Sequence, residues 1–229
     1  ITYGDGKFVA MSNNEGTMFV ATDVENWTEV SGPNATYTDV TYGNNLFVAV
    51  ATNTAAGISQ VSTSPDGYNW TNVDINKIPR PDPTNGYNWF GVTYGNGKFV
   101  AVCNNYLEGV MTSSNGTEWT MRQDCAPTEI NYWASVVYAN DIFVAVATYA
   151  NTEAAIMYSN DAITWKRAES PSGTDNSWSA VTYGDGRFVA VGNSGVYNSM
   201  YSYDGINWRA APGAEDNYWE DVAYGTVDL

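Results

Sequence analysis

The most constraining feature of the sequence is an internal repeat that occurs five times. A Phe-Val-Ala run recurs in every copy and is followed by a closing tryptophan. The runs begin at Phe8, Phe47, Phe99, Phe143 and Phe188. The tryptophans are Trp27, Trp70, Trp119, Trp165 and Trp208, with spacings of 43, 49, 46 and 43 residues. A period in this range, made of short strand-like segments, is typical of propeller blades.

Each repeat reads as four short strands. The first strand ends in Tyr-Gly or an equivalent pair, and a two-residue turn follows it: Asp5-Gly6, Asn44-Asn45, Asn96-Gly97, Asn140-Asp141 and Asp185-Gly186. Asn, Asp and Gly tolerate the positive φ that tight hairpin turns require. The second strand, Phe-Val-Ala-Val or a close relative, is apolar without alternation, so we expect both of its faces to be buried.

These signals predict a single all-β domain over residues 1–229, a β-propeller of four-stranded antiparallel blades. The repeat units are 1–35, 36–86, 87–130, 131–175 and 176–216. Residues 217–229 contain a sixth copy of the first strand, which we expect to pair with the second strand of the first repeat and so close a five-bladed ring. The alternative is a fragment of a ring of six to eight blades.

A second motif, Ser-x-Asp-Gly-x-x-Trp, lies between the third and fourth strands. It comprises Ser64, Asp66, Gly67 and Trp70; Ser113, Asn115, Gly116 and Trp119; Ser159, Asp161, Ala162 and Trp165; and Ser202, Asp204, Gly205 and Trp208. The first copy is eroded to Ala21, Asp23, Val24 and Trp27. Ser and Asp oxygens can hold the backbone of such a loop, while the tryptophan fixes the loop to its sheet.

This motif resembles the Asp-box (BNR) repeat of sialidase-like β-propellers, shortened by one residue before the tryptophan. Together with the Tyr-Gly-Asn-Gly-Lys-Phe-Val-Ala-Val run, it resembles repeats of phage tail or minor structural proteins and of secreted bacterial proteins. The resemblance covers essentially the whole chain. It implies a scaffold role for the motif, away from any active site, and an extracellular or virion-surface location.

The composition narrows the classes of partner. The chain has 25 acidic and 9 basic residues and no histidine, a net charge of −16. This charge argues against nucleic-acid and anionic-membrane partners, and no apolar run is long enough to insert in a membrane. The absence of an EF-hand loop argues against calcium held by loop carboxylates. We expect no metal and no cofactor. Cys103 and Cys125 follow strands of the same repeat and are either a disulfide or two separate thiols.

A set of aromatic and amide side chains precedes the first strand of each repeat. Its members are Tyr37, Tyr87, Trp89, Asn131, Tyr132, Trp133, Asn176, Trp178, Asn217, Tyr218 and Trp219. One interpretation is a packing layer between blades. The other is a ring of aromatic platforms with amide partners, suited to stacking on sugars. The connections at that end of the repeats vary in length, whereas the opposite turns are nearly constant, and divergent loops on a rigid scaffold often bind ligands.

Enzymatic activity is disfavoured by the residues present. Arg122, Arg167 and Arg209 follow the closing tryptophans and cannot form the arginine triad of a sialidase at the axis. Without histidine, a Ser-His-Asp triad is excluded. Asp39, Glu220 and Asp221 leave a glycoside hydrolase as one alternative. A structural propeller that decorates a virion or fibre is another. The leading hypothesis is a non-catalytic module that recognises a glycan or a cell-surface receptor.

Overall fold

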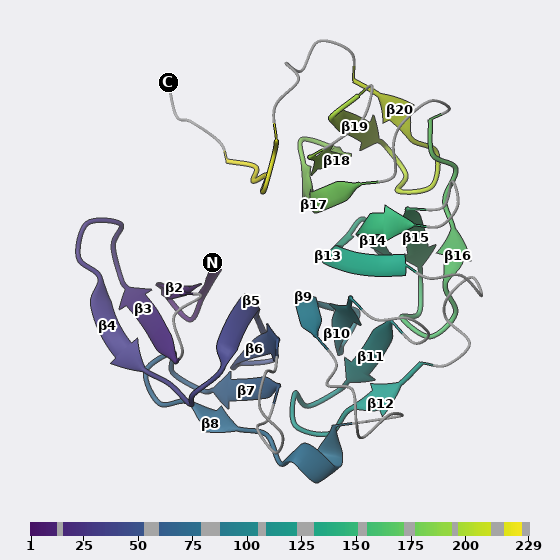
Figure 1. Cartoon of the computed structure of the whole chain (residues 1–229). Coiled ribbons are helices and arrows are strands. Elements are labelled where there is room, and N and C mark those ends of the chain that lie inside the picture. The colour runs from purple at the N-terminus through teal and green to yellow at the C-terminus, as the bar shows by residue number, and fades with distance from the viewer. Residues whose placement is uncertain are drawn as a thin grey trace. The chain divides into compact units, whose positions relative to one another are not determined.

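The computed structural model describes residues 1–12, 16–52, 60–78, 88–104, 109–122, 131–150, 155–171, 177–193, 197–211 and 218–225. These residues form five four-stranded antiparallel sheets, each with its strands in chain order, and one sheet falls in each of the five predicted repeat units (Figure 1). The predicted all-β fold of four-stranded blades is confirmed. We refer to the strands of a sheet as its first to fourth strands, from the Tyr-Gly strand outward.

The chain divides into two compact units, residues 1–104 with 110–122 and residues 105–109 with 123–229. In the first unit, the first sheet consists of β1 (Thr2–Gly4), β2 (Lys7–Met11), β3 (Thr17–Ala21) and β4 (Thr28–Ser31). The second sheet consists of β5 (Thr36–Gly43), β6 (Leu46–Thr52), β7 (Val61–Ser64) and β8 (Thr71–Asn72). The third sheet consists of β9 (Trp89–Gly95), β10 (Lys98–Cys103), β11 (Val110–Ser113) and β12 (Thr120–Met121). A 3-10 turn, η1 (Ile75–Lys77), follows β8.

In the second unit, the fourth sheet consists of β13 (Asn131–Ala139), β14 (Ile142–Ala150), β15 (Ile156–Ser159) and β16 (Lys166–Arg167). The fifth sheet consists of β17 (Trp178–Gly184), β18 (Arg187–Gly192), β19 (Ser199–Ser202) and β20 (Arg209–Ala210).

The tight turns between first and second strands adopt the predicted conformation in all five sheets. Both central residues have positive φ, for example 48° and 56° at Asn44 and Asn45 and 47° and 72° at Asn96 and Gly97. Positive φ at both positions defines the hairpin turn whose twist matches that of its strands. The turn residues therefore set the register of each hairpin locally, as in the pairing of Gly43 with Leu46.

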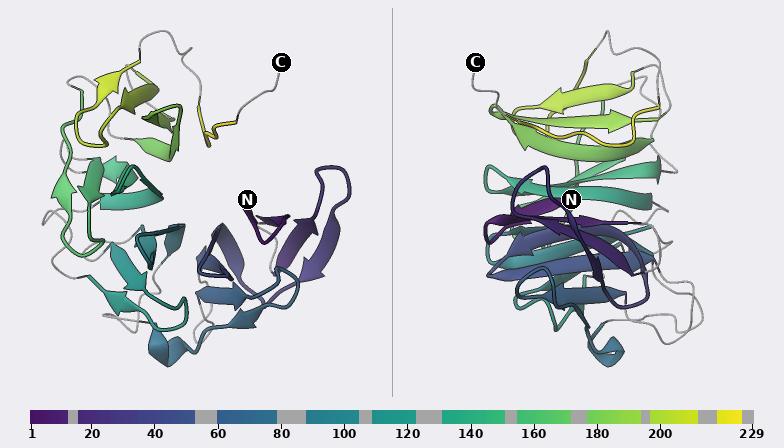
Figure 2. Two further views of the ribbon diagram at one scale, coloured as in Figure 1. Left: turned by 180° about the vertical axis from the view of Figure 1, so that it is seen from behind. Right: turned by 90° about the vertical axis from the view of Figure 1, so that its left-hand side faces the viewer.

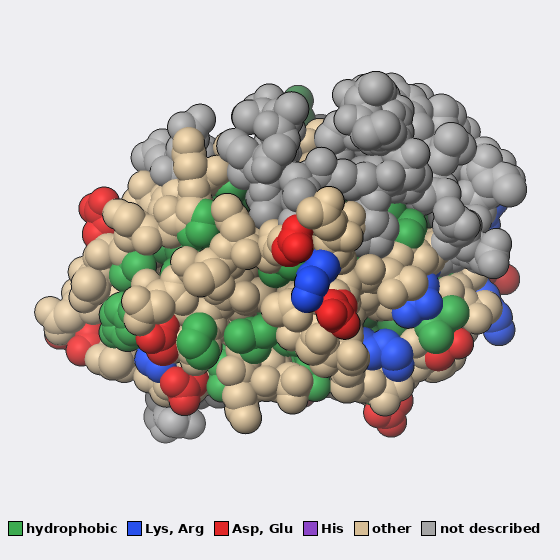
Figure 3. Space-filling view, turned by 90° about the horizontal axis from the view of Figure 1, so that it is seen from below, with side chains coloured by type: hydrophobic (Ala, Val, Ile, Leu, Met, Phe, Trp, Pro, Cys, Tyr) green, Lys and Arg blue, Asp and Glu red, His purple; other side chains and the backbone are tan. Residues whose placement is uncertain are grey.

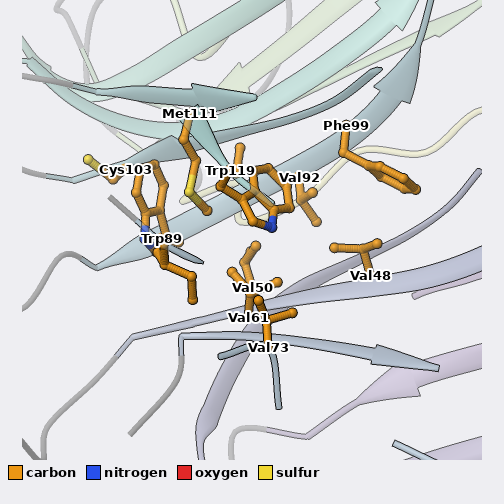
Figure 4. Close-up of a cluster of buried hydrophobic side chains, with 12 residues drawn as sticks. Val48, Val50, Val61, Val73, Trp89, Val92, Phe99, Cys103, Met111 and Trp119 are labelled. Atoms are coloured by element: carbon orange, nitrogen blue, oxygen red, sulfur yellow. The ribbon is translucent and has the colours of Figure 1, made fainter. Parts of the chain in front are cut away.

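The second strands are buried on both faces, as their unbroken apolar sequence predicts. On β6, Phe47 and Ala49 pack into a cluster with side chains of the first sheet, such as Val9 and Met18. Val48 and Val50 point the other way, into a cluster with the third sheet (Figure 4). Within the first unit, β5 packs on β1 and β2, and β9 packs on β5 and β6 (Figure 2).

Each long first strand is irregular just after its aromatic residue. The register of β5 shifts between Tyr37 and Asp39, and that of β17 shifts between Trp178 and Ala180. An extra residue in one strand reverses the alternation of side chains beyond it. The aromatic side chain therefore lies on the packing face together with a residue three positions further on, as Tyr37 and Val40 do in one buried cluster.

The structure corrects the predicted closure of the first sheet. The place beside β2 is taken by β1, with Tyr3 paired to Phe8 and Gly4 to Lys7, and not by the C-terminal segment. Since β3 occupies the other side of β2, both of its edges are paired within the first repeat. The described C-terminal residues, 218–225, form no strand. The predicted closure would have left residues 1–4 displaced or redundant, whereas they pair with β2 through the adjacent two-residue turn.

Candidate functional site

Two ends can be distinguished in every sheet. Because the strands are antiparallel and follow one another, the turn between first and second strands and the turn between third and fourth strands lie at one end. We call this the locked end. The connection between second and third strands, and the exit from the fourth, lie at the other, which we call the variable end. In the second sheet the locked end carries Asn44–Asn45 and Asp66–Asn69.

The locked end is held by a repeated hydrogen-bond pattern in the Ser-x-Asp-Gly-x-x-Trp turn. In the second sheet, Gly67 N donates to Ser64 Oγ over 2.8 Å, and Asn69 N donates to Asp66 Oδ1 over 2.8 Å. Trp70 Nε1 donates to the carbonyl of Gly67 over 2.7 Å. The same three bonds recur in the third and fifth sheets. The predicted scaffold role of these residues therefore has a direct physical basis.

The carboxylates in these turns are stabilised in their charged form. The backbone N–H of Asn69, followed by its side-chain amide, holds the pKa of Asp66 well below its ordinary value. Partial burial tends to raise the pKa of Asp204, but the N–H groups of Asn207 and Ile206 hold it low. A carboxylate that accepts several N–H bonds stays ionised, so these groups serve the turn and not acid catalysis.

The turns of the first and fourth sheets depart from the pattern. Ala162 stands where the others have glycine and adopts a positive φ of 62°. In the part of the chain that the structure describes, Trp165 Nε1 has no hydrogen-bond partner. In the first sheet Ala21 replaces the serine, although Asp23 still accepts the N–H groups of Glu25 and Asn26.

Four members of the predicted aromatic set are buried: Trp89 is 0% exposed, Trp133 and Trp178 are 1% exposed, and Tyr37 is 3% exposed. The hydroxyl of Tyr37 lies 2.7 Å from Ser62 Oγ, and burial raises the pKa of Tyr37 to about 12. A buried ring has no free face for a sugar. The prediction of stacking platforms is therefore wrong for these four, and the packing interpretation holds, because the irregular first strands turn them inward.

The remaining members of the set differ in exposure. Tyr218 and Trp219 are exposed at 82% and 40%, and Tyr132 is half-buried. Tyr87, Asn176 and Asn217, together with the side chain of Asn131, lie outside the described residues. The connections at the variable end, including 53–59 and 79–87, also lie outside them, so their predicted role in recognition stays a prediction.

The candidate carboxylates of a glycosidase include one with a structural task. Asp39 Oδ1 accepts the N–H of Val40 and Asp39 Oδ2 accepts that of Val92, each over 2.8 Å, so this side chain ties β5 to β9. Asp221 Oδ1 accepts the N–H of Val222 in the same way. Glu220 is exposed. The described residues contain no group of three or more metal-binding side chains.

The arginine side chains make local contacts. Arg122 donates from Nε and Nη2 to Thr112 Oγ1. Arg187 Nη2 lies 3.2 Å from Asp185 Oδ2. Acidic and basic side chains lie interspersed on the face shown in Figure 3.

Cys103 is buried, whereas Cys125 lies outside the described residues, so the predicted disulfide stays a prediction. No helix in the described part of the chain is long and apolar enough to cross a membrane.

Sequence reasoning missed one surface, which we call the first-blade face: Ile1, Tyr3, Val24 and Trp27. These side chains are exposed at 71%, 60%, 70% and 39%. The corresponding tryptophans Trp70, Trp119, Trp165 and Trp208 are at most 9% exposed. The signal was present in the sequence. Val24 occupies the position at which the other turns have Gly67, Gly116, Ala162 and Gly205, so its larger side chain marks this turn as different.

No family model matches the chain, and no curated protein sequence matches it. In structure it is similar to streptogramin B lyase, with a TM-score of 0.74 and 14% identity over 94% of this chain and 68% of the other. It is similar to the nidogen/laminin complex structure, with a TM-score of 0.63 and 9% identity over 93% of this chain and 81% of the other.

Two further similar solved structures have chains that are longer than this one. The designed Ika8 protein matches with a TM-score of 0.63 and 11% identity over 98% of this chain, and YCF48 bound to D1 peptide matches with a TM-score of 0.55 and 15% identity over 89%. The chain spans 64% and 65% of their lengths. The matches support a propeller and not the Asp-box repeat in particular. Together with the five sheets, they show that the chain has the fold of a β-propeller.

Proposed function

We propose that the protein is a non-catalytic recognition module that binds a cell-surface receptor, or the glycan it carries, through the variable end of its sheets. We propose further that it acts at an extracellular or virion surface, as in a phage tail. The single observation that carries this proposal is the contrast between the two ends of each sheet. One end is fixed by the same three bonds in the second, third and fifth sheets, and the sequence varies at the other end.

The locked end has little freedom to diversify. The serine, the acid and the closing tryptophan all contact the backbone of their own turn, as Ser64, Asp66 and Trp70 do. Leaving a buried N–H without its acceptor costs about 1–3 kcal/mol, so change at these positions is penalised by stability. The connections between second and third strands differ in length instead, as the segments Ser12–Thr17, Thr52–Gln60 and Thr148–Ala154 show. A rigid scaffold with divergent connections suits recognition.

The class of partner follows from what the aromatic residues do. With Tyr37, Trp89, Trp133 and Trp178 buried, a repeated sugar-stacking ring is not available, and this favours a polypeptide receptor over a free glycan. Two structural neighbours support this choice, because YCF48 was solved with the D1 peptide and nidogen with laminin. Several weak contacts at the variable ends would add through avidity.

The test is a loop exchange. The connection 53–59 is replaced by the short connection 13–15, which joins the same two strands in the first sheet. Binding of the whole chain is then measured against a panel of cell-surface proteins and against a glycan array. We expect the variant to lose at least one interaction of the parent chain while its unfolding midpoint stays within a few degrees, because the exchange leaves all five sheets intact.

The matched control alters the locked end of the same sheet. Asn45→Gly converts the Asn-Asn turn to the Asn-Gly pair found at Asn96 and should leave binding unchanged. Binding that survives the loop exchange but is lost in Asn45→Gly would contradict the proposal. A chain that binds neither proteins nor glycans would favour the structural propeller, and turnover of a chromogenic glycoside would favour the glycoside hydrolase.

A further inference from the structure

Two Asn-Gly pairs lie in turns of the third sheet, in different surroundings. Asn96–Gly97 is the turn between β9 and β10, and Asn115–Gly116 belongs to the turn between β11 and β12. A third pair, Asn85–Gly86, lies outside the described residues. An asparagine before glycine is prone to deamidation, because glycine has no Cβ to keep its backbone nitrogen away from the preceding side-chain amide. The two turns therefore show how the fold controls one reaction.

The pair at Asn115 is held in an unreactive arrangement. Gly116 is buried, and its N–H donates to Ser113 Oγ over 2.8 Å. Asn115 Oδ1 accepts the N–H groups of Thr117 and Glu118 over 3.0 and 2.9 Å, which fixes the side-chain amide. An attack of the Gly116 nitrogen on the Asn115 side chain would have to break these bonds first, and the loss of buried hydrogen bonds is costly. The locked turn therefore protects this pair.

The pair at Asn96 lies in open surroundings. Asn96 and Gly97 are both exposed and form the centre of the hairpin turn, with φ of 47° and 72°. The ladder between β9 and β10 ends at the pairing of Gly95 with Lys98, so Gly97 lies beyond it. Apart from its chain neighbours, no atom of the described residues comes within 4 Å of a Cβ added to Gly97. Solvent water therefore reaches both partners of the reaction.

We propose that Asn96 is a site of spontaneous deamidation in the folded chain. The deprotonated backbone nitrogen of Gly97 forms a bond to Cγ of Asn96, the bond from Cγ to Nδ2 breaks, and ammonia leaves with the proton. Water then opens the cyclic imide that results. Cleavage between Cγ and the Gly97 nitrogen yields aspartate, whereas cleavage at the backbone carbonyl yields isoaspartate. The side-chain amide and water are thereby converted to a carboxylate and ammonium, with no oxidation or reduction.

The aspartate product fits the turn of the third sheet. Asp5 and Asp185 hold the position of Asn96 in the first and fifth sheets, with nearly the same φ of 48° and 47°. Each forms an ion pair with the cation two residues further on, Lys7 or Arg187. The third sheet has such a cation, Lys98, but an amide in place of the acid. Deamidation to aspartate supplies the missing carboxylate, whereas isoaspartate adds a main-chain carbon to a two-residue turn and disturbs it.

The test compares the two pairs within one chain. The whole folded chain is incubated at mildly alkaline pH, and peptide mapping by mass spectrometry follows the loss of each side-chain amide, with Asn85 read separately. We expect Asn96 to be converted at least tenfold faster than Asn115. In the urea-unfolded chain the two should react at similar rates, because only the fold distinguishes them. The reaction is independent of the recognition proposed above, since both turns lie at the locked end.

A variant of the second sheet creates the same reaction at a new place. Asn45→Gly gives Asn44 a glycine neighbour in an exposed turn, so Asn44 should lose its amide at a rate within a few-fold of that at Asn96. Asn45→Asp is the matched control, since it reproduces the Asn140–Asp141 turn, and should leave the amide of Asn44 in place.

The variant Asn96→Asp carries the aspartate product from the start and should unfold at the midpoint of the parent chain. A lower midpoint would overturn the fit of that product to the turn. The proposal itself would be overturned by conversion of Asn96 in the unfolded chain only, or by equal rates at Asn96 and Asn115 in the folded chain. An unreactive Asn44 in the Asn45→Gly variant would overturn it as well.

Discussion

At the scale of single residues, the chain places unusual backbone conformations on the few side chains that tolerate them. Asn and Asp occupy most of the non-glycine positions with positive φ, and their short polar side chains make this conformation less costly. Ala162 is the exception, since alanine has no such compensation. The fourth turn therefore carries strain that the other turns avoid.

Relief of that strain is directly measurable. Ala162→Gly should raise the free energy of unfolding by about 1 kcal/mol, because glycine adopts the φ of 62° without a steric penalty. Gly116→Ala is the reverse change at the equivalent site, where a Cβ would lie 2.8 Å from Leu46, and should destabilise the fold. Urea denaturation of both variants checks the pair. Equal effects of the two substitutions would contradict this account of the turn.

The Asp66 carboxylate predicts a dependence of stability on pH. Its pKa is lowered in the folded state, so ionised Asp66 stabilises the fold above the ordinary carboxyl pKa of about 4, and this contribution is lost as the pH falls toward the lower folded value. Asp66→Asn should lose less stability than the parent between neutral and acid pH. Asn115→Asp should lose more, since Asn115 accepts the same two N–H bonds. Thermal unfolding across this pH range checks the order of the three proteins.

At the scale of elements, contacts within the first unit depend on glycines that end a first strand, such as Gly4 of β1 and Gly43 of β5. The Tyr94 ring lies where a Cβ of Gly43 would stand, so no side chain fits without moving β9. Gly43→Ala should therefore cost about 1–3 kcal/mol, the usual penalty for overpacking a filled site. Gly225→Ala is the matched control, with nothing within 4 Å of its added Cβ, and should leave the unfolding midpoint of the chain unchanged. Similar losses in both variants would show that the ring contact is not what selects glycine.

The elements that the sequence predicted well are those set by neighbours in the chain. The Asn-Asn turn at Asn44 and the two-faced burial of Phe47 and Val48 follow from local conformation and hydrophobic pattern. The direction of Trp89 and Trp178 did not follow, because an extra residue in the strand turns them inward. Nor did the clamp by Asp39, whose partner Val92 lies 53 positions further along the chain. The sequence of a single repeat does not predict which sheets pack against one another.

At the scale of the whole molecule, the repeat places stabilising turns at one end of each sheet and leaves the other end for the recognition that we propose. The net charge of −16 is spread among many side chains, and the described face in Figure 3 mixes both signs, which suits solubility more than a single charged binding patch. The second, third and fifth sheets repeat the same three hydrogen bonds at their locked ends. The variable ends are thereby free to differ without loss of the fold, as the proposed recognition requires.

The most direct measurement of this separation is a hydrogen-exchange footprint of the whole chain with a bound receptor identified by the binding panel. The account predicts that slowed exchange falls on the connections of the variable end, such as 53–59 and 79–87. Exchange at the locked turns, such as Asn44–Asn45 and Asp66–Asn69, should stay as it is in the free chain. Protection confined to the locked turns, with the variable connections unaffected, would contradict it.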